Sequence, residues 1–487
     1  MIEGPLGDLL AYGIETGLIE AGDVPYVRNR VLEVLRIDDY DLTAERSGAR
    51  GTIDELLRPL LDDAAARGLI GPDTTIQRDL WDTAIMGCFV QRPSETQHKF
   101  WEDYAISPER ATQRFHAAAV ASNYIRVTRT DRNVTWVHPS RYGDLDMTIN
   151  LSKPEKDPRD IAAAVGAHES TYPACLLCRE NEGYAGRPDH PARQNLRLVQ
   201  MDLGGEAWFL QYSPYRYYQE HCIVLSDEHR PMAMNRATLQ RLAAFTALFP
   251  HYIVGSNADL PIVGGSILSH DHYQGGRYRF PMDRAVTLWS QDRDGVLVEV
   301  LDWPLAVIRL RGDDADVLDL ADRVLAAWRS YDDPAHQVAA FTGATAHNTV
   351  TPIARREAGA LRLDIVLRNN RTSAEHPDGI FHPHAEIHPV KKENIGLIEV
   401  MGLAVLPDRL ERELGMVAAA LESGQELPPE AAAHAPMLAA LRHVGPADDA
   451  LTQVRTAAAD MFVRGLEHCG VFGADVVAGC QAFLVRV

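Results

Sequence analysis

The chain has 487 residues, of which 46% are hydrophobic and 24% charged, as expected for a globular protein of two or three domains. Its net charge of −20 argues against a nucleic-acid-binding surface, because phosphate backbones require clustered Lys and Arg. The six cysteines include only one close pair, which is typical of a reducing compartment, and we expect no signal peptide, no membrane span and a cytoplasmic location.

Residues 1–130 are predicted to form a helical N-terminal domain. Apolar residues recur near helical spacing over 54–66 and 108–125, and Ser107-Pro108 is a typical helix start. This region contains no chemical motif, so we expect a role in packing or assembly.

A region rich in strands follows over residues 131–290. Gly204-Gly205 predicts a hairpin between strands at 196–201 and 207–212. The remaining apolar runs predict strands at 221–225, 253–255 and 266–273, and a helix at 236–249.

Residues 291–400 show the same alternation of predicted strands and helices. Residues 401–487 are rich in Ala and Leu and are predicted to be helical. The expected elements of 291–400 are strands at 296–301, 305–310 and 381–387, a helix at 315–328, and a hairpin of 349–353 with 361–367. The predicted fold class is α+β, with a mixed or antiparallel sheet.

The stretch Gly264–Gly276 holds the strongest chemical signal. On an extended strand His270, His272 and Gln274 would share one face. Flanking glycines let backbone amides approach a ligand closely, which suits a phosphate under attack by an imidazole. A metal-binding histidine pair, or two surface histidines on an edge strand, would give the same spacing.

This stretch, His270-Asp271-His272-Tyr273-Gln274, resembles the active-site motif of the second class of galactose-1-phosphate uridylyltransferases. Three further stretches fit the same class: Thr148–Lys156, His347–Ala354 and Gly379–His384. The resemblance implies two tandem half-domains of the histidine-triad type, over 131–290 and 291–400, each with one His-x-His element.

The resemblance also implies an activity. In this family the second histidine, here His272, attacks UDP-glucose, and the uridylyl-histidine then passes UMP to galactose 1-phosphate. Gln274 would hold the phosphate as a neutral donor that is a poor acid or base. The preferred hexose, galactose or N-acetylgalactosamine, stays open, and a homodimer is implied by analogy alone.

Two other functions are compatible with these motifs. The first is a nucleotide hydrolase or phosphorylase of the histidine-triad type. The second is a non-catalytic, zinc-stabilised protein that holds UDP-sugars.

Cys175-Leu176-Leu177-Cys178 is typical of half a zinc site. The resemblance adds His229 and His270, giving a closed Cys2His2 structural site that ties the start of the domain to the active strand. A reduced pair without metal, or a redox pair, are the alternatives. No organic cofactor is expected.

A second cluster comprises His382, His384, Glu386 and His388, at alternate positions. The common class of the family binds iron at its corresponding His-x-His, with a glutamate from just after the catalytic strand. Residues 277–292 contain no Glu, which favours a polar network around the phosphates over a second metal.

Substrate phosphates require donors and cations. The candidates are the backbone at Gly265 and Ser266 and the side chains of Lys153, Arg368 and Lys392. Taken singly, each cation could equally be an ordinary solvated or salt-bridged residue.

Overall fold

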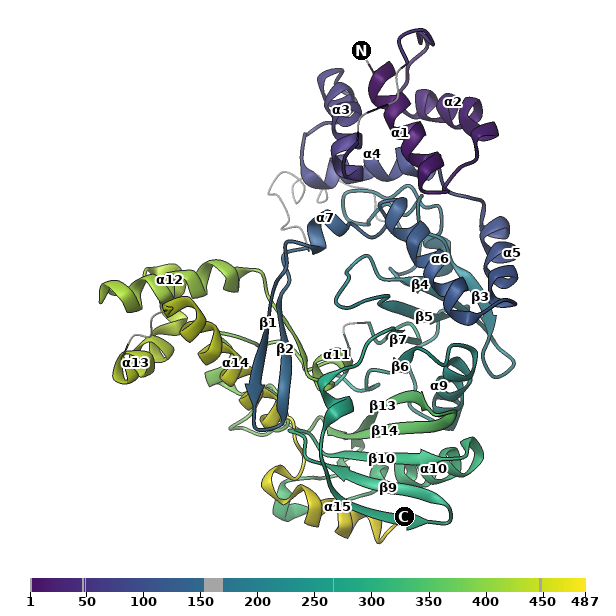
Figure 1. Cartoon of the computed structure of the whole chain (residues 1–487). Helices are drawn as coiled ribbons and strands as arrows, with labels where there is room; N and C mark the ends of the chain where they lie inside the picture. Colours follow the sequence, from purple (N-terminus) through teal and green to yellow (C-terminus); the bar gives the residue numbers. More distant parts are fainter. Residues whose placement is uncertain (1, 46–47, 49, 153–169, 266, 446–448) are drawn as a thin grey trace. The chain divides into compact units, whose positions relative to one another are not determined.

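The computed structural model describes residues 2–45, 48, 50–152, 170–265, 267–445 and 449–487 (Figure 1). The chain forms two compact units. The first unit comprises Met1–Arg132 and Ser152–His229, and the second comprises Asn133–Leu151 and Arg230–Val487.

The N-terminal part of the first unit is helical, as predicted. Its helices are α1 (Glu3–Glu15), α2 (Val24–Val34), α3 (Ile53–Ala66), α4 (Thr75–Gly87), α5 (Pro93–Tyr104), α6 (Pro108–Ala121) and α7 (Val127–Thr130). The expected helix start at Ser107 is confirmed, because its hydroxyl accepts the Arg110 N–H at 3.1 Å. Apolar faces of α1 to α4 share one core that includes Leu6, Leu57 and Met86.

The strands of the first unit form an antiparallel meander. They are β3 (Val199–Asp202), β4 (Ala207–Tyr212) and β5 (Cys222–Ser226), with β4 paired to both neighbours. The predicted hairpin is confirmed: Asp202 pairs with Ala207, and Gly204 and Gly205 both have positive φ in the turn.

A small sheet of the second unit joins segments from distant parts of the chain. β1 (Val134–Ser140) and β2 (Gly143–Ile149) form a hairpin, and β15 (Leu403–Leu406) pairs parallel to β2. The segment 401–487, which the sequence predicts to be helical, therefore also contains one strand, β15. Three of its four residues are buried, and the strand forms by pairing with a hairpin some 250 residues upstream in the sequence, which local periodicity does not report.

The main sheet of the second unit follows the order β7-β6-β13-β14-β10-β9-β8 with antiparallel pairs. Its strands are β6 (Ile253–Gly255), β7 (His272–Gly276), β8 (Thr287–Arg293), β9 (Val296–Leu301), β10 (Val307–Gly312), β13 (Asn348–Glu357) and β14 (Ala360–Asn369). A separate short pair is formed by β11 (Phe341–Thr342) and β12 (Thr345–Ala346). Most strands lie where the sequence predicts them, and the β13–β14 hairpin is confirmed.

Helices α9 (Arg236–Leu248) and α10 (Asp314–Arg329), both predicted as helices from the sequence, pack on this sheet (Figure 1). Alternate residues of β14, such as Leu363 and Ile365, are buried apolar side chains. Residues of the other parity include Arg362 and Asp364, which belong to a buried ionic network.

The C-terminal part of the second unit is helical apart from β15. It contains α11 (Leu397–Val400), α12 (Arg409–Ser423), α13 (Ala435–Val444), α14 (Ala450–His468) and α15 (Val476–Leu484). The strand predicted at 381–387 is absent from the described chain, which instead forms a 3-10 turn at Ala385–Ile387. Pro383 has no N–H to donate to a ladder, which disfavours a strand there.

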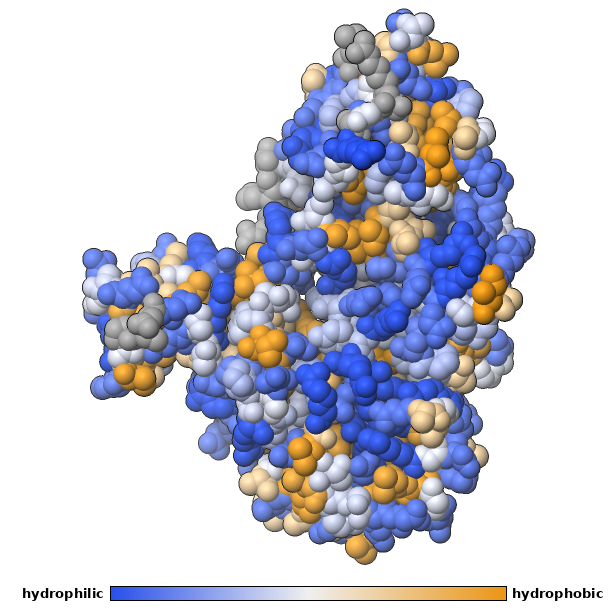
Figure 2. All heavy atoms as spheres, in the orientation of Figure 1, coloured by the Kyte–Doolittle hydropathy of each residue, from blue (hydrophilic) through white to orange (hydrophobic). Residues whose placement is uncertain are grey.

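No helix among the described residues combines the length and apolarity that crossing a bilayer requires. On the face shown in Figure 2, hydrophilic residues predominate and apolar ones gather in separate groups, one of them over α1 and α2.

Candidate functional site

The glycine-rich stretch 264–276 enters the main sheet later than predicted. β7 begins at His272, and Gln274 pairs with Gly255 of β6. His270 lies in the loop before the strand, so the expectation that it shares a strand face with His272 and Gln274 is wrong. Only the latter two stand two residues apart on β7 and therefore on one face.

Close packing of the preceding loop explains this late start. A Cβ on Gly264 would lie 2.5 Å from the Ala258 oxygen, and one on Gly265 would lie 2.6 Å from Asn257 Nδ2. Both distances are shorter than real side chains tolerate; the backbone oxygen near Gly264 makes glycine necessary there, whereas a side chain at Gly265 would require the Asn257 side chain to move. The loop is thereby held against 257–260 instead of running on as a strand.

His272 is held in one tautomer. Its Nδ1 lies 2.8 Å from the backbone oxygen of His270. A carbonyl oxygen only accepts, so Nδ1 carries the proton and Nε2 carries the lone pair. Burial lowers the pKa of His272 to about 4, which keeps the imidazole neutral and nucleophilic near neutral pH.

Gln274 and Tyr273 have different surroundings on β7. Gln274 is half-buried, on the parity of His272. Tyr273 is fully buried on the opposite parity, with its hydroxyl 3.5 Å from Arg241 Nη1. On one face of the strand, the imidazole nitrogen that carries the lone pair can attack a phosphoryl group, and the carboxamide can hold it.

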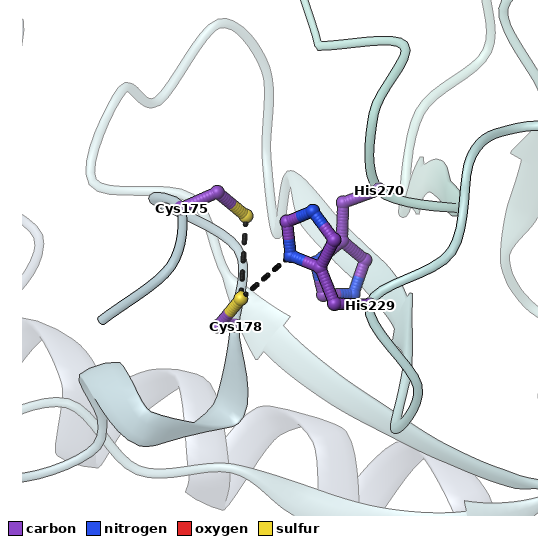
Figure 3. A group of neighbouring side chains, drawn as sticks. All are labelled: Cys175, Cys178, His229 and His270. Carbon is purple, nitrogen blue, oxygen red and sulfur yellow. Dashed lines mark hydrogen bonds between the residues drawn. The ribbon is translucent and has the colours of Figure 1, made fainter. Parts of the chain in front are cut away.

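Cys175, Cys178 and His229 come together in the first unit. Cys178 Sγ lies 3.5 Å from Cys175 Sγ and 3.0 Å from His229 Nδ1. With His270, their ligand atoms all lie within 4.8 Å of one another (Figure 3). The four residues expected from the sequence therefore form one group that could hold a metal ion.

The turn that carries the two thiols is fixed by Asn181. Its Nδ2 donates to the backbone oxygens of Cys175 and Cys178 at 2.8 and 2.7 Å. His190 Nε2 lies 2.7 Å from Asn181 Oδ1 and orients the amide in turn. Burial raises the pKa of Cys178 to about 12, and a bound cation would reverse this and favour the thiolate.

The second predicted cluster is divided by the structure. His384 and Glu386 meet His468 of α14, with ligand atoms within 4.8 Å, whereas His382 Nδ1 and His388 Nε2 lie 3.1 and 3.0 Å from the oxygen of Pro383. His468 was not predicted as a member of this cluster, because it lies 84 residues from His384 in the sequence and no local motif marks it.

The two histidines of the His384–Glu386–His468 group make polar contacts of their own. The rings of His384 and His468 stack at 4.1 Å, and the His384 N–H donates to His468 Nδ1 at 3.2 Å. His384 Nε2 donates to the oxygen of Ile380 at 3.0 Å. These contacts agree with the interpretation of this region as a hydrogen-bonded network.

The predicted substrate-binding residues differ in how deeply they are buried, and two of them are not described by the structure. Ser266 and Lys153 lie outside the described residues. Lys392 is exposed, while Lys391 beside it is buried, with Nζ 2.6 Å from Glu399 Oε1. The sequence did not distinguish these two lysines, because nothing local in it reports burial.

Arg368 on β14 is fully buried. Its Nη2 donates to the oxygen of Ile395 at 3.0 Å, and Nε and Nη1 have no hydrogen-bond partner within the described part of the chain. Burial lowers its pKa, as expected for a guanidinium that lacks a paired carboxylate.

Comparison with known proteins places these residues in a family. Residues 18–231 match the model described as galactose-1-phosphate uridyl transferase, N-terminal domain, and residues 246–435 match the corresponding C-terminal domain. The galactose-1-phosphate uridylyltransferase of Bacillus subtilis is 48% identical over 98% of this chain and 96% of that protein. The enzyme of the same name from Halalkalibacterium halodurans is 51% identical over 85% of this chain and 83% of that protein.

Among solved structures, the yeast Ap4A phosphorylase Apa2 aligns with a TM-score of 0.31 and 11% identity, over 57% of this chain and 83% of that one. The family assignment rests on the sequence matches.

Proposed function

Because this chain belongs to the galactose-1-phosphate uridylyltransferase family, we propose that it transfers UMP from UDP-glucose to galactose 1-phosphate. The products are UDP-galactose and glucose 1-phosphate, and the protein is a nucleotidyltransferase of galactose metabolism. The tautomer of His272, with Nδ1 hydrogen-bonded to the His270 backbone oxygen, is the main support for the mechanism below.

The reaction proceeds in two displacements. The lone pair on His272 Nε2 attacks the α-phosphorus of UDP-glucose, and the bond from that phosphorus to the bridging oxygen breaks, releasing glucose 1-phosphate. A phosphate oxygen of galactose 1-phosphate then attacks the same phosphorus and breaks the P–N bond. Neither leaving group requires a proton from the enzyme, and the ring returns unchanged.

The His270 carbonyl supports the intermediate. The imidazole becomes positively charged when Nε2 bonds to phosphorus, and the Nδ1–H bond to the carbonyl oxygen then strengthens. The orienting group is a neutral carbonyl, so it does not remove the Nδ1 proton, and the charged ring remains a good leaving group for the second displacement.

Gln274 holds the phosphoryl group on the parity of His272. Its carboxamide donates to a non-bridging oxygen as negative charge develops and is a poor base toward water. These properties favour transfer to a sugar phosphate over hydrolysis. Phosphate contacts from Gly265, Ser266, Lys153, Arg368 and Lys392 complete the proposed substrate site.

Zinc is the metal that best fits the Cys175–Cys178–His229–His270 group. Two thiolates and two imidazoles make the closed tetrahedral donor set of structural zinc. Such an ion would stabilise the fold and leave no ligand position for substrate. The protein would work in the cytoplasm, which keeps these thiols reduced, and as a homodimer by analogy.

The test is incubation with UDP-glucose alone, followed by intact mass measurement at neutral pH. We expect a mass increase of one uridylyl group and one equivalent of free glucose 1-phosphate. The matched control is His272→Asn, which should remain unmodified. An unmodified native protein that releases UMP would indicate a hydrolase, and one that only binds UDP-glucose would indicate a non-catalytic protein.

A further inference from the structure

The first unit contains a cavity of about 290 Å³ that involves none of the residues assigned to uridylyl transfer or to the metal group. It is lined by the end of α1, by α5 and α6, and by the segment that precedes β3. This volume is near the lower end of the range of about 300–1,000 Å³ for small-molecule pockets.

Aromatic rings form much of the cavity wall. Phe100 and Phe115 pack edge to face with ring centroids 5.8 Å apart, and Phe115 lies 5.3 Å from the ring of Tyr212. The Tyr212 hydroxyl donates to the Thr112 oxygen at 2.8 Å, which fixes its ring against α6. Rigid rings of this kind favour a flat apolar body packed against them.

Among the charged residues that line the cavity, positive charge predominates, although the chain as a whole carries a net charge of −20. The cations are Lys99, Arg114 and Arg197, and the one lining carboxylate is Asp103. Asp103 is engaged by Arg114 at 2.9 Å and also by Arg110 at 2.7 Å. It is therefore not available to neutralise the other two cations.

Lys99 and Arg197 have no ion-pair partner within the described ranges. Arg197 donates only to backbone oxygens, those of Gln91, Gln194 and Leu196, the last two at 3.0 and 2.6 Å. Burial lowers the pKa of Arg197, and the more distant Glu182 and Glu95 only partly offset that cost. An anion in the cavity would supply the missing charge.

A buried hydroxyl provides a second, independent observation. Tyr124 lines the cavity at 5% exposure, and its Oη has no hydrogen-bond partner in the part of the chain described. Leaving such a group unpaired costs free energy, which a ligand oxygen would recover.

From these features we propose that the cavity binds a small organic anion with a flat apolar body, such as an aryl carboxylate or sulfonate. The acidic group lies against Lys99 and Arg197, and the ring packs against the wall formed by Phe100, Phe115 and Tyr212. Such a ligand is chemically unlike the sugar phosphates, because the aromatic part of the wall favours a flat apolar body.

The experiment uses the full chain and two fluorescent probes. Anilinonaphthalene sulfonate carries the anionic group, and phenylnaphthylamine is its uncharged analogue. We expect saturable binding of one sulfonate probe per chain, with at least tenfold weaker binding of the neutral probe. Lys99→Gln and Arg197→Gln should each weaken the sulfonate at least threefold, and Ala118→Trp, which fills the cavity, should abolish its binding.

The control is Arg58→Gln, which removes the same charge from an exposed position on α3 outside the cavity and should bind as the native protein does. Lys99 and Ala118 are not deeply buried, so these variants test the site even if Arg197→Gln fails to fold. Unsaturable binding, equal affinity for the two probes, or unchanged affinity in Lys99→Gln and Ala118→Trp would overturn the proposal. Inorganic phosphate competing as well as benzoate would show that the apolar walls contribute nothing and would also overturn it.

Discussion

The backbone oxygen of His270 lies 2.8 Å from Nδ1 of His272, while the side chain of His270 belongs to the metal-binding group. One residue thus contributes its imidazole to the metal group and its carbonyl to the proposed nucleophile. The two sites are joined by a two-residue step in the chain, so a change in the backbone at His270 alters both.

Replacing His272 with Asn should abolish transfer and leave the fold intact. The variant loses the nucleophilic nitrogen but no large core side chain, and a loss of about 10⁴-fold or more is expected for a covalent nucleophile. UDP-galactose formation measures the effect, and circular dichroism checks the fold. His443→Asn, an exposed position on α13, is the control and should retain full activity. Substantial turnover by His272→Asn would rule out this residue as the nucleophile.

Replacing Cys175 with Ser should weaken metal binding and stability more than chemistry. Purified native protein should contain roughly one zinc per chain, because Cys2His2 is a closed structural donor set. The variant should lose most of that zinc and melt about 5 °C or more lower, since metal binding contributes to folding free energy. Elemental analysis and thermal melts measure the two effects.

Cys88→Ser is the matched control for this prediction. Cys88 directly follows α4 and lies outside the group, so its replacement should leave zinc content unchanged. A native preparation that is free of metal and fully active would contradict the assignment.

Replacing Gln274 with His should shift the reaction from transfer toward hydrolysis. Histidine supplies a base near neutral pH beside the uridylyl group, and the loss of the carboxamide donor should slow exchange by roughly a hundredfold. UMP and UDP-galactose are quantified by chromatography with and without galactose 1-phosphate. Gln291→His, on the exposed strand β8, should behave as the native protein. Acceptor-independent UMP release by the native protein at the rate of transfer would instead identify a hydrolase.

Replacing Asp364 with Asn should destabilise the second unit strongly. Asp364 Oδ1 and Oδ2 accept from Arg309 at 2.7 and 2.9 Å, and Oδ2 also accepts from Arg362 at 3.1 Å, with all three side chains buried. Removing the carboxylate takes away the ion-pair partner of buried Arg309, whereas Arg362 keeps its pairs with Asp283 and Glu357, and we expect a cost of about 3–5 kcal/mol. Urea unfolding measures the difference, and Asp314→Asn at a half-exposed pair with Arg356 should cost about 1 kcal/mol or less.

The same carboxylate predicts a pH dependence. Burial alone would raise the pKa of Asp364, but Arg362 and Arg309 outweigh it and hold the pKa below its usual value. Its contribution is therefore complete above the unfolded pKa of about 3.9 and is lost as pH falls through the lower folded value. The stability gap between the native protein and Asp364→Asn should be constant from neutral pH to about 5 and narrow only below about 4. A gap that narrows above pH 5 would contradict this assignment.

Sequence alone determined the features that depend on neighbours along the chain. The hairpin at Gly204-Gly205, the helix predicted at 236–249 and the β13–β14 hairpin follow from turn chemistry and periodicity. The motif at 270–274 and the Cys175–Cys178 pair were equally visible, because their spacing carries the chemistry. The division into segments at 130, 290 and 400 stays a prediction.

Only the tertiary structure decided the features that depend on partners far along the chain. Asn257 and Ala258 pack against the glycine loop and delay β7 until His272, which removes His270 from the strand. His468, and neither His382 nor His388, lies with His384 and Glu386 in the second cluster. Lys391 is the buried lysine, and it is paired with Glu399. Sequence periodicity records the direction of each side chain relative to its own element, whereas burial and pairing depend on which distant element lies opposite.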